Sequence, residues 1–361
     1  MKRAAALLLA LFLLPLPVRA AGVVRTSASA AVLMDGESGR VLHAYCAQER
    51  RPIASITKLM TALVAAELCP DFSQKVTIRR EWTGIEGSSM YLKPGEQLTV
   101  EELLYGLLLS SGNDAAAAIA GLCCGSQEAF AARMNEKAAA LGMEDTHFTD
   151  PSGLDDQGQW STAYDVALLA RAVLAREDLS AIAATRTTTA AGRYLANHNK
   201  LLWRYDGCTG LKTGYTERAG RTLVSSAQQD GQTLIAVTLS DPNDWADHAR
   251  LLDYGFEIYP RRLVLEGGRR WLVPCAGSLC PFAEASAGAD LYYPLAEGER
   301  LELDLSLAEG VQAPVAPGTQ LGTARLTLNG ETVLTVPLTC RTGVLDDRAP
   351  AGLLERIFGG G

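Results

Sequence analysis

The hydrophobic pattern of the chain changes near residue 261, and this change constrains the fold most. Before that point, alanine-rich helical segments alternate with strand-like runs. After it, short runs are separated by glycine and proline, and apolar residues alternate cleanly over 301–307. Alternation with a period of two is typical of a strand with one buried face, and 361 residues suffice for two domains. We therefore expect a mixed domain over residues 24–262 and a small all-β domain over residues 263–344.

The first region is predicted to contain both helices and antiparallel strand pairs. Apolar residues at helical spacing, bounded by capping and breaking residues, predict helices over 57–68, 114–122, 127–141, 162–174 and 244–254. Alternating runs predict hairpins that pair 31–34 with 40–44, 222–227 with 233–239, and, in the second region, 324–328 with 332–336. Asp230-Gly231 is a typical hairpin turn. Ser161 is the expected N-cap of the helix over 162–174.

The N-terminal segment has the pattern of an export signal. Lys2 and Arg3 precede a short apolar run over residues 4–14, and small residues surround Ala20. The run is too short for a permanent transmembrane helix. We expect residues 1–20 to be a cleaved signal peptide, so the protein works outside the cytoplasm; a retained anchor is the alternative.

Net charge and composition exclude several classes of function. The chain carries a net charge of −8 at pH 7, and removal of residues 1–20, with their three basic side chains, brings it to −11. Such an acidic chain lacks the basic surface that binds phosphate, so we expect no nucleic-acid partner. With 48% hydrophobic and 20% charged residues, the chain has the composition of a folded globular protein.

The eight cysteines permit disulfides in an oxidising compartment, but their spacing does not fix the pairing. Cys275 and Cys280 are close enough for a small-loop bridge. Adjacent Cys123 and Cys124, in an alanine-rich helix, are more typical of buried small apolar residues. The chain has no CxxC pair and its histidines lack ligand spacing, so we expect no metal site and no cofactor.

Lys58 follows Ser55 by three residues at the start of the first predicted helix. Positions i and i+3 share a helix face, so the amine can reach the hydroxyl. A serine needs a neighbouring base to act as a nucleophile, and a lysine can be that base when burial or nearby positive charge lowers its pKa. The helix start also supplies N–H groups for a developing oxyanion. Alone, this spacing is equally typical of a surface helix turn.

A second element, Ser111-Gly112-Asn113, stands where an apolar run gives way to the alanine-rich helix. The serine could pass a proton between Lys58 and a leaving amine, and the asparagine amide could hold a substrate peptide bond. Taken alone, the element would be an ordinary helix N-cap.

The third element, Lys212-Thr213-Gly214, precedes the second strand pair and is expected on an exposed edge strand. Lys212 supplies a positive charge, Thr213 a hydroxyl donor to an anionic group, and Gly214 room for close approach of a substrate backbone. Taken alone, the element would be a turn.

Together, the three elements form the ordered motif set of penicillin-binding proteins and class A β-lactamases. Over residues 24–258 the chain resembles the low-molecular-mass penicillin-binding proteins, specifically the D-alanyl-D-alanine carboxypeptidases of the serine peptidase class. The resemblance is carried by Ala54–Thr61, Ser110–Ala115, Pro151–Asp155 and Asp206–Gly220. It implies an α+β fold in which a helical cluster packs on an antiparallel sheet, with a trailing all-β domain and the active site in the groove between cluster and sheet.

The resemblance also implies the roles of the catalytic residues. Ser55 attacks the carbonyl between two D-alanines, and Lys58 accepts its proton. Ser111 relays a proton to the departing D-alanine, while Asn113 orients the donor peptide. Water then hydrolyses the acyl-enzyme, so the expected partners are peptidoglycan stem peptides ending in D-Ala-D-Ala, in the cell-wall or periplasmic space, and β-lactams as acylating inhibitors.

Recognition of the terminal carboxylate is implied for Lys212 and Thr213, and an oxyanion hole for the N–H groups of Ser55 and Tyr215. His198 stands where some relatives place an arginine; a hydrogen-bonded loop histidine is the alternative. The expected substrate-binding residues are Asn113, His198, Lys212, Thr213, Gly214, Tyr215 and Thr216.

Two departures separate the chain from class A β-lactamases. The middle motif is Ser-Gly-Asn rather than Ser-Asp-Asn, and the loop over 150–160 contains no glutamate to activate a deacylating water. We therefore expect slow release of penicillin. A D,D-endopeptidase that cuts cross-links and a non-catalytic wall-binding protein remain alternatives.

Two further features remain open. The aromatic side chains of Tyr91, Trp160 and Trp203 are candidates for lining the groove, although aromatic residues more often belong to the core. Apolar residues at helical spacing over 353–358, in the tail over 345–361, are a candidate for weak peripheral membrane contact; a frayed polar tail is the alternative.

Overall fold

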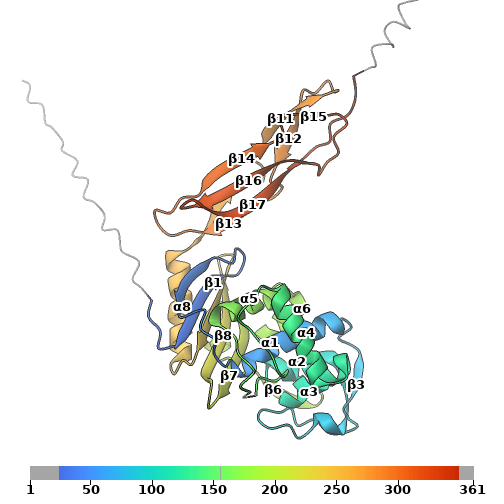
Figure 1. Cartoon of the computed structure of the whole chain (residues 1–361), viewed down its shortest axis with the longest axis vertical. Helices are drawn as coiled ribbons and strands as arrows, with labels where there is room; N and C mark the ends of the chain where they lie inside the picture. Colours follow the sequence, from blue (N-terminus) through green and yellow to red (C-terminus); the bar gives the residue numbers. More distant parts are fainter. Residues whose placement is uncertain (1–23, 155, 349–361) are drawn as a thin grey trace, which may run out of the picture.

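The computed structural model describes residues 24–154 and 156–348. The predicted signal peptide and the amphipathic segment over 353–358 lie outside these residues. Two sets of elements are stacked along the long axis, and the β-rich set follows directly after the last long helix (Figure 1). This arrangement confirms the expected α+β class with a C-terminal all-β part. The division at residue 262 stays a prediction.

A five-stranded antiparallel sheet, in the order β2-β1-β9-β8-β7, forms the centre of the first region. Its strands are β1 (Ala30–Asp35), β2 (Val41–Tyr45), β7 (Cys208–Thr216), β8 (Gly220–Gln229) and β9 (Gln232–Leu239). The β8–β9 turn has positive φ at both Asp230 and Gly231, as expected for this hairpin. β7 is an edge strand, which confirms the prediction for the Lys-Thr-Gly segment.

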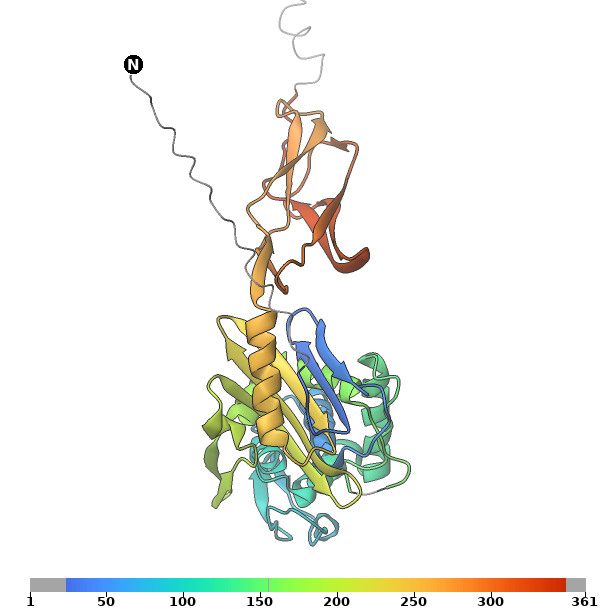
Figure 2. The ribbon, with the colours of Figure 1, turned by 90° about the vertical axis from the view of Figure 1, so that its left-hand side faces the viewer.

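Helices cover both faces of the sheet. Helix α8 (Asp244–Ile258) lies along one face, as Figure 2 shows, and α5 (Ala163–Leu174) packs on the other. Beyond α5 lies a cluster of helices built around α1 (Thr57–Leu68). Ten of the 12 residues of α1 are buried. A helix that is apolar all round is typical of a core position. The N-cap of α5 is Thr162 rather than Ser161, because the Thr162 hydroxyl accepts a hydrogen bond from Asp165 N.

The remaining elements of this region complete the helical cluster and form short connecting segments of strand and helix on its surface. They are η1 (Ala54–Ile56), β3 (Lys75–Thr77), η2 (Arg80–Trp82), β4 (Gln97–Thr99), α2 (Val100–Leu108), α3 (Asn113–Cys124), α4 (Gln127–Ala140), α6 (Glu177–Ala184), β5 (Thr187–Ala190), β6 (Arg193–Ala196) and α7 (Leu201–Arg204). Within the described residues, no single helix is long and apolar enough to cross a membrane; only the pair α3 and α4, bent by 84°, together meets the criteria of length and composition.

The C-terminal region contains two sheets. A six-stranded sheet has the order β14-β16-β17-β12-β11-β15, and β10 pairs with β13. The strands are β10 (Arg261–Leu265), β11 (Trp271–Ala276), β12 (Phe282–Ser286), β13 (Leu291–Pro294), β14 (Glu302–Leu307), β15 (Val311–Gln312), β16 (Gln320–Leu328) and β17 (Glu331–Cys340). Cys275 is buried and Cys280 exposed, and both are free thiols, so the small-loop bridge is not present.

Arg40, beside β2, joins the two regions. Its guanidinium donates to both carboxylate oxygens of Glu299, at 2.6 and 2.8 Å, and to the carbonyl of Pro294 at 2.6 Å. It also lies over the rings of Tyr259 and Tyr293. A bidentate pair of this kind fixes orientation as well as distance.

Candidate active site

Ser55 lies in η1, immediately before α1, at the junction of the helical cluster and strand β7. It lines a groove of about 460 Å³. The preceding Ala54 has φ +50°, an unusual value for a residue with a Cβ atom. A Cβ on Gly153 would lie 2.0 Å from the Ala54 carbonyl oxygen, so only glycine fits against this turn. The serine is therefore presented from a strained, tightly packed corner.

Lys58 is fully buried in the first turn of α1, three residues after Ser55. Its Nζ lies 3.0 Å from Ser55 Oγ and 2.5 Å from the carbonyl oxygen of Ser152. Burial, and then the positive charge of Lys212, lower the pKa of Lys58 well below its usual value, although Asp150 and Asp114 act in the opposite direction. A neutral amine at hydrogen-bond distance from a serine hydroxyl can accept its proton.

The segment Asp150-Pro151-Ser152-Gly153 holds the carbonyl that contacts Lys58. Asp150 Oδ1 accepts hydrogen bonds from the N–H and hydroxyl of Ser152, both at 2.6 Å, and from Gly153 N at 2.8 Å. Thr61 donates to the Pro151 carbonyl at 2.6 Å. Sequence reasoning found this segment only through the resemblance and gave it no role, although an Asp followed by Pro-Ser-Gly is a recognisable turn signal.

Ser111 and Asn113 enter the site from the start of α3. Ser111, with φ +60°, is 4% exposed and lines the groove. The N-cap of α3 is Gly112, so Ser111 does not cap this helix. Asn113 does not line the groove; its Nδ2 donates to the Glu86 carbonyl at 2.5 Å and its N–H to the Ser88 carbonyl at 2.7 Å. Asn113 is 4% exposed, so in this structure its amide serves mainly to hold the neighbouring loop.

Strand β7 forms the opposite wall, with Thr213, Gly214 and Tyr215 lining the groove. A Cβ on Gly214 would lie 2.5 Å from Thr222 Oγ1 and 3.0 Å from Ser55 N. Glycine is therefore required because β7 packs directly against the backbone of the serine. This close approach also brings the N–H of Ser55 to the strand that carries Tyr215.

Lys212 and Thr216 lie on the same strand but outside the groove lining. Lys212 is 1% exposed, its Nζ donates to the Thr213 carbonyl at 3.0 Å, and burial lowers its pKa to about 7. Thr216 accepts a hydrogen bond from Ala219 N at 3.0 Å. The positive charge of Lys212 thus lies behind Thr213 rather than on the groove surface.

His198 lines the groove, as expected. Burial, followed by the charge of Lys212, lowers the pKa of its imidazole, which favours the neutral ring. The backbone N–H of His198 donates to the Leu109 carbonyl at 3.3 Å. Of the three candidate aromatic residues, none lines the groove; Trp160 stacks on His147 with ring centroids 5.3 Å apart.

Sequence reasoning missed a second group of groove residues, which come from the loop between η2 and β4, from the loop after β6, from β8 and from the start of α8. Arg221 and Asp244 form a salt bridge at 2.7 Å. The group comprises Ser88, Asn197, Lys200, Arg221, Thr222, Asp244 and Trp245. The pairing of β8 with the Lys-Thr-Gly strand is the one sequence signal that could have identified Arg221 and Thr222. In the described ranges, no group of three or more His, Cys, Asp and Glu side chains is arranged to hold a metal ion.

Comparison with known proteins gives matches along nearly the whole chain. Residues 18–243 match the family model described as D-alanyl-D-alanine carboxypeptidase, and residues 282–344 match that of the penicillin-binding protein 5 C-terminal domain. The chain is 32% identical to D-alanyl-D-alanine carboxypeptidase DacF of Bacillus subtilis, over 92% of this chain and 89% of that protein. It is 34% identical to DacA of Escherichia coli, over 88% and 83% of the two chains.

The same similarity appears in three dimensions. The crystal structure of penicillin-binding protein 5 from Haemophilus influenzae superposes with a TM-score of 0.76 at 29% identity, covering 89% of this chain and 98% of that one. Both the helix-and-sheet region and the β region are therefore shared with solved relatives.

Proposed function

Because the chain belongs to the D-alanyl-D-alanine carboxypeptidase family of serine peptidases, we propose that it removes the terminal D-alanine of peptidoglycan stem peptides through an acyl-enzyme on Ser55. The observation that carries the proposal is the 3.0 Å contact between Ser55 Oγ and the buried amine of Lys58. The lowered pKa of Lys58 favours the neutral form that a general base requires.

Acylation starts with attack of Ser55 Oγ on the carbonyl carbon of the penultimate D-alanine, while Lys58 Nζ takes the hydroxyl proton. The N–H groups of Ser55 and Tyr215 stabilise the oxyanion. As the peptide bond breaks, Ser111, which lines the same groove, gives its hydroxyl proton to the departing D-alanine nitrogen and takes up the proton held by Lys58, which restores the neutral amine. The products of this step are free D-alanine and an ester on Ser55.

Deacylation uses water as the second nucleophile. Lys58 removes a proton from the water, the ester carbonyl is attacked, and Ser55 leaves as the hydroxyl. β-Lactams acylate the same serine, and we expect slow release of their ring-opened ester, because the 150–160 loop lacks the glutamate that speeds deacylation in class A β-lactamases.

Substrate orientation depends on the two walls of the groove. Asn113 holds the donor peptide from the helical side, and the Thr213 hydroxyl binds the terminal carboxylate from β7 with the charge of Lys212 behind it. Gly214 allows β7 to stand close to Ser55. His198 and Thr216 complete the proposed substrate-binding set.

We place this reaction outside the cytoplasm, in the cell-wall compartment, on the basis of the export signal and of the substrate in the relatives' names. The tail over 345–361 is proposed as a weak membrane contact. Vesicle flotation of the protein with and without residues 349–361 tests this contact.

The experiment that tests the proposed function uses purified muropeptides. Monomers with a pentapeptide stem should lose one D-alanine and become tetrapeptides, while cross-linked dimers should stay intact. Splitting of the dimers without release of terminal D-alanine would instead establish an endopeptidase. Binding to both substrates without any cleavage would establish a wall-binding protein.

A further inference from the structure

Two cysteines that are 54 residues apart in the sequence meet at the ends of two helices. Cys69 is the C-cap of α1, and Cys123 lies in the last turn of α3. Their sulfur atoms are 2.9 Å apart. The proposed mechanism uses neither residue. Four other thiols donate to backbone carbonyl groups instead, namely those of Cys208, Cys275, Cys280 and Cys340.

The sulfur atoms of Cys69 and Cys123 are closer than in an ordinary packing contact. Non-bonded carbon atoms pack at about 3.5–4.0 Å, and sulfur is a larger atom. A disulfide bond is about 2.0 Å long, so the two sulfur atoms need to approach by only about 0.9 Å to form one. Both cysteines are free thiols in this structure. They are therefore held where a bond between them requires little movement of either helix.

An oxidant can reach this pair through Cys123. Cys69 is 8% exposed, whereas Cys123 is half-buried and so is not the fully buried apolar residue that its sequence context suggests. Cys124 is also half-buried, and it lies close enough to Cys69 for the two thiols to interact electrostatically. Cys124 is therefore the competing partner for Cys69.

The two helices carry proposed catalytic elements at their other ends. Ser55 immediately precedes α1, and Ser111 and Asn113 stand at the start of α3. The two helices pack against each other within the helical cluster (Figure 1). Cys123 is ten residues after Asn113, which is about 15 Å along the helix. A bond between Cys69 and Cys123 would therefore fix the spacing of the two helices without entering the groove.

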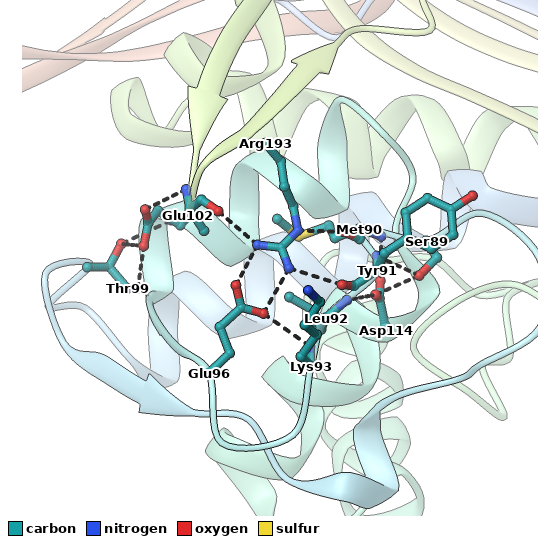
Figure 3. Close-up of polar contacts among 11 residues, drawn as sticks. Ser89, Met90, Tyr91, Leu92, Lys93, Glu96, Thr99, Glu102, Asp114 and Arg193 are labelled. Carbon is teal, nitrogen blue, oxygen red and sulfur yellow. Dashed lines mark hydrogen bonds and ion pairs between the residues drawn. The ribbon is translucent and has the colours of Figure 1, made fainter.

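The start of α3 is already held by polar contacts (Figure 3). Asp114, which is 1% exposed, accepts hydrogen bonds from the N–H groups of Met90 and Leu92, both at 2.9 Å, and from the Ser89 hydroxyl at 2.7 Å. Arg193, from β6, donates to the Met90 carbonyl at 2.7 Å. A covalent link at the last turn of α3 would anchor the opposite end of the same helix.

We propose that Cys69 and Cys123 are a disulfide site, oxidised by thiol–disulfide exchange, and that the bond fastens α1 to α3 behind the groove. The export signal places the chain in a compartment where such bonds can persist. The inference goes beyond the proposed function, because the bond takes no part in the reaction at Ser55.

The bond forms in two exchange steps with an external disulfide, R–S–S–R. The Cys123 thiolate attacks one of its sulfur atoms and R–S⁻ leaves; the Cys69 thiolate then attacks the Cys123 sulfur of the mixed disulfide and displaces the second R–S⁻. The two thiol protons pass to the leaving thiolates, so the cysteines are oxidised and R–S–S–R is reduced to two R–SH. Burial, followed by the hydrogen bond with Cys69, raises the pKa of the Cys123 thiol, so the exchange should quicken as the pH rises.

The test begins with the purified, fully reduced protein, which is incubated with oxidised glutathione at mildly alkaline pH. The remaining thiols are then alkylated and the protein is digested with trypsin without reduction. Tryptic peptide 59–75, which contains Cys69, should be joined to the peptide that contains Cys123. Reduction before alkylation should release it.

Two serine variants distinguish the neighbouring thiols. Cys124→Ser should form the link to peptide 59–75 at the native rate. Cys123→Ser should form it about tenfold more slowly or not at all, because the sulfur atom that is in contact with Cys69 is missing. The two variants are a matched pair, since adjacent, half-buried cysteines receive the same substitution.

Thermal unfolding measures what the bond does. Oxidation should raise the Tm of the native protein by about 5–10 °C, because the bond closes a long loop. Cys123→Ser should have the same Tm in oxidising and reducing buffer; this comparison within one variant does not depend on how far the substitution itself destabilises the fold. Free peptide 59–75 after oxidation, a link that forms as fast in Cys123→Ser as in the native protein, or equal Tm values for the oxidised and reduced native protein would overturn the proposal.

Discussion

The two regions of the molecule bury different kinds of side chain. The core of the first region contains Lys58, Asp114 and Lys212, each at most 1% exposed. Among the described residues of the second region, the buried polar side chains are two serines, Ser278 and Ser286, and the core is aliphatic. Burial of a charge is costly unless it is paired. The proposed chemistry gives a reason for this cost at Lys58 and Lys212, whereas the β region needs only to fold.

The largest effect is expected from Lys58, the most deeply buried charged group beside the groove. Lys58→Met removes the proposed base and should lower the rates of acylation by peptide and by penicillin by about 10²- to 10⁴-fold. The free energy of unfolding should stay the same or rise, because a buried amine is replaced by an apolar side chain of similar length. Stopped-flow acylation and urea unfolding measure the two quantities. A large loss of stability with native acylation would mean that the lysine is structural.

The second prediction tests the contact between β7 and Ser55. Gly214→Ala places a methyl group 2.5 Å from Thr222 Oγ1 and 3.0 Å from Ser55 N, so the strand must move away from the serine. A displacement of this size should reduce kcat/KM by about 10- to 100-fold. Gly268→Ala is the matched control in the β region, since a Cβ there meets nothing within 4 Å. Equal activity of the two variants would argue against the close approach.

The third prediction concerns pH. Burial lowers the pKa of Lys212 to about 7, so this group is charged below that pH in the free enzyme and loses its charge as the pH rises. The kcat/KM for a substrate with a terminal carboxylate should therefore fall above pH 7, by up to about tenfold per unit. A substrate with a terminal carboxamide should lack this descending limb. The same limb with both substrates would assign the titration to another group.

The fourth prediction concerns the β region and has the smallest effect on activity. Leu338→Ala, at a position that is fully buried in the aliphatic core, should destabilise this region by about 3 kcal/mol. The kcat/KM at 25 °C should stay within about twofold of the native value, because the region contributes no residue to the groove. A parallel loss of activity would show that the β region supports the catalytic one.

Much of the fold could be predicted because its signals are local. Helix α1 spans the predicted residues. The Asp230-Gly231 and Asn329-Gly330 turns have the positive φ angles of tight hairpin turns, and each joins a pair of antiparallel strands. Helices α2 and α6 were not predicted. The apolar residues over 103–109 do not by themselves distinguish a helix from a buried strand. Thr99 and Glu102, which form a capping box at the start of α2, are the sequence signal for a helix there.

The proposed catalytic residues could be found in the sequence because they occur in short motifs, whereas the residues that support them could not. The Ser152 carbonyl contacts Lys58 across 94 residues, and Arg193 holds the Tyr91 carbonyl across 102. Spacing along the chain carries no information about such pairs. Every residue, moreover, has a backbone carbonyl, so the residue type does not indicate which carbonyl accepts a hydrogen bond.

The assignment of Ser55 as the nucleophile is tested most directly by the site at which penicillin becomes attached. The purified protein is incubated with a penicillin, its intact mass is recorded, and the adduct is located by peptide mapping beside a Ser55→Ala variant. We expect one adduct per chain, on the peptide that contains Ser55, and none on the variant. An adduct on another residue, or equal labelling of Ser55→Ala, would contradict the assignment of Ser55 as the nucleophile.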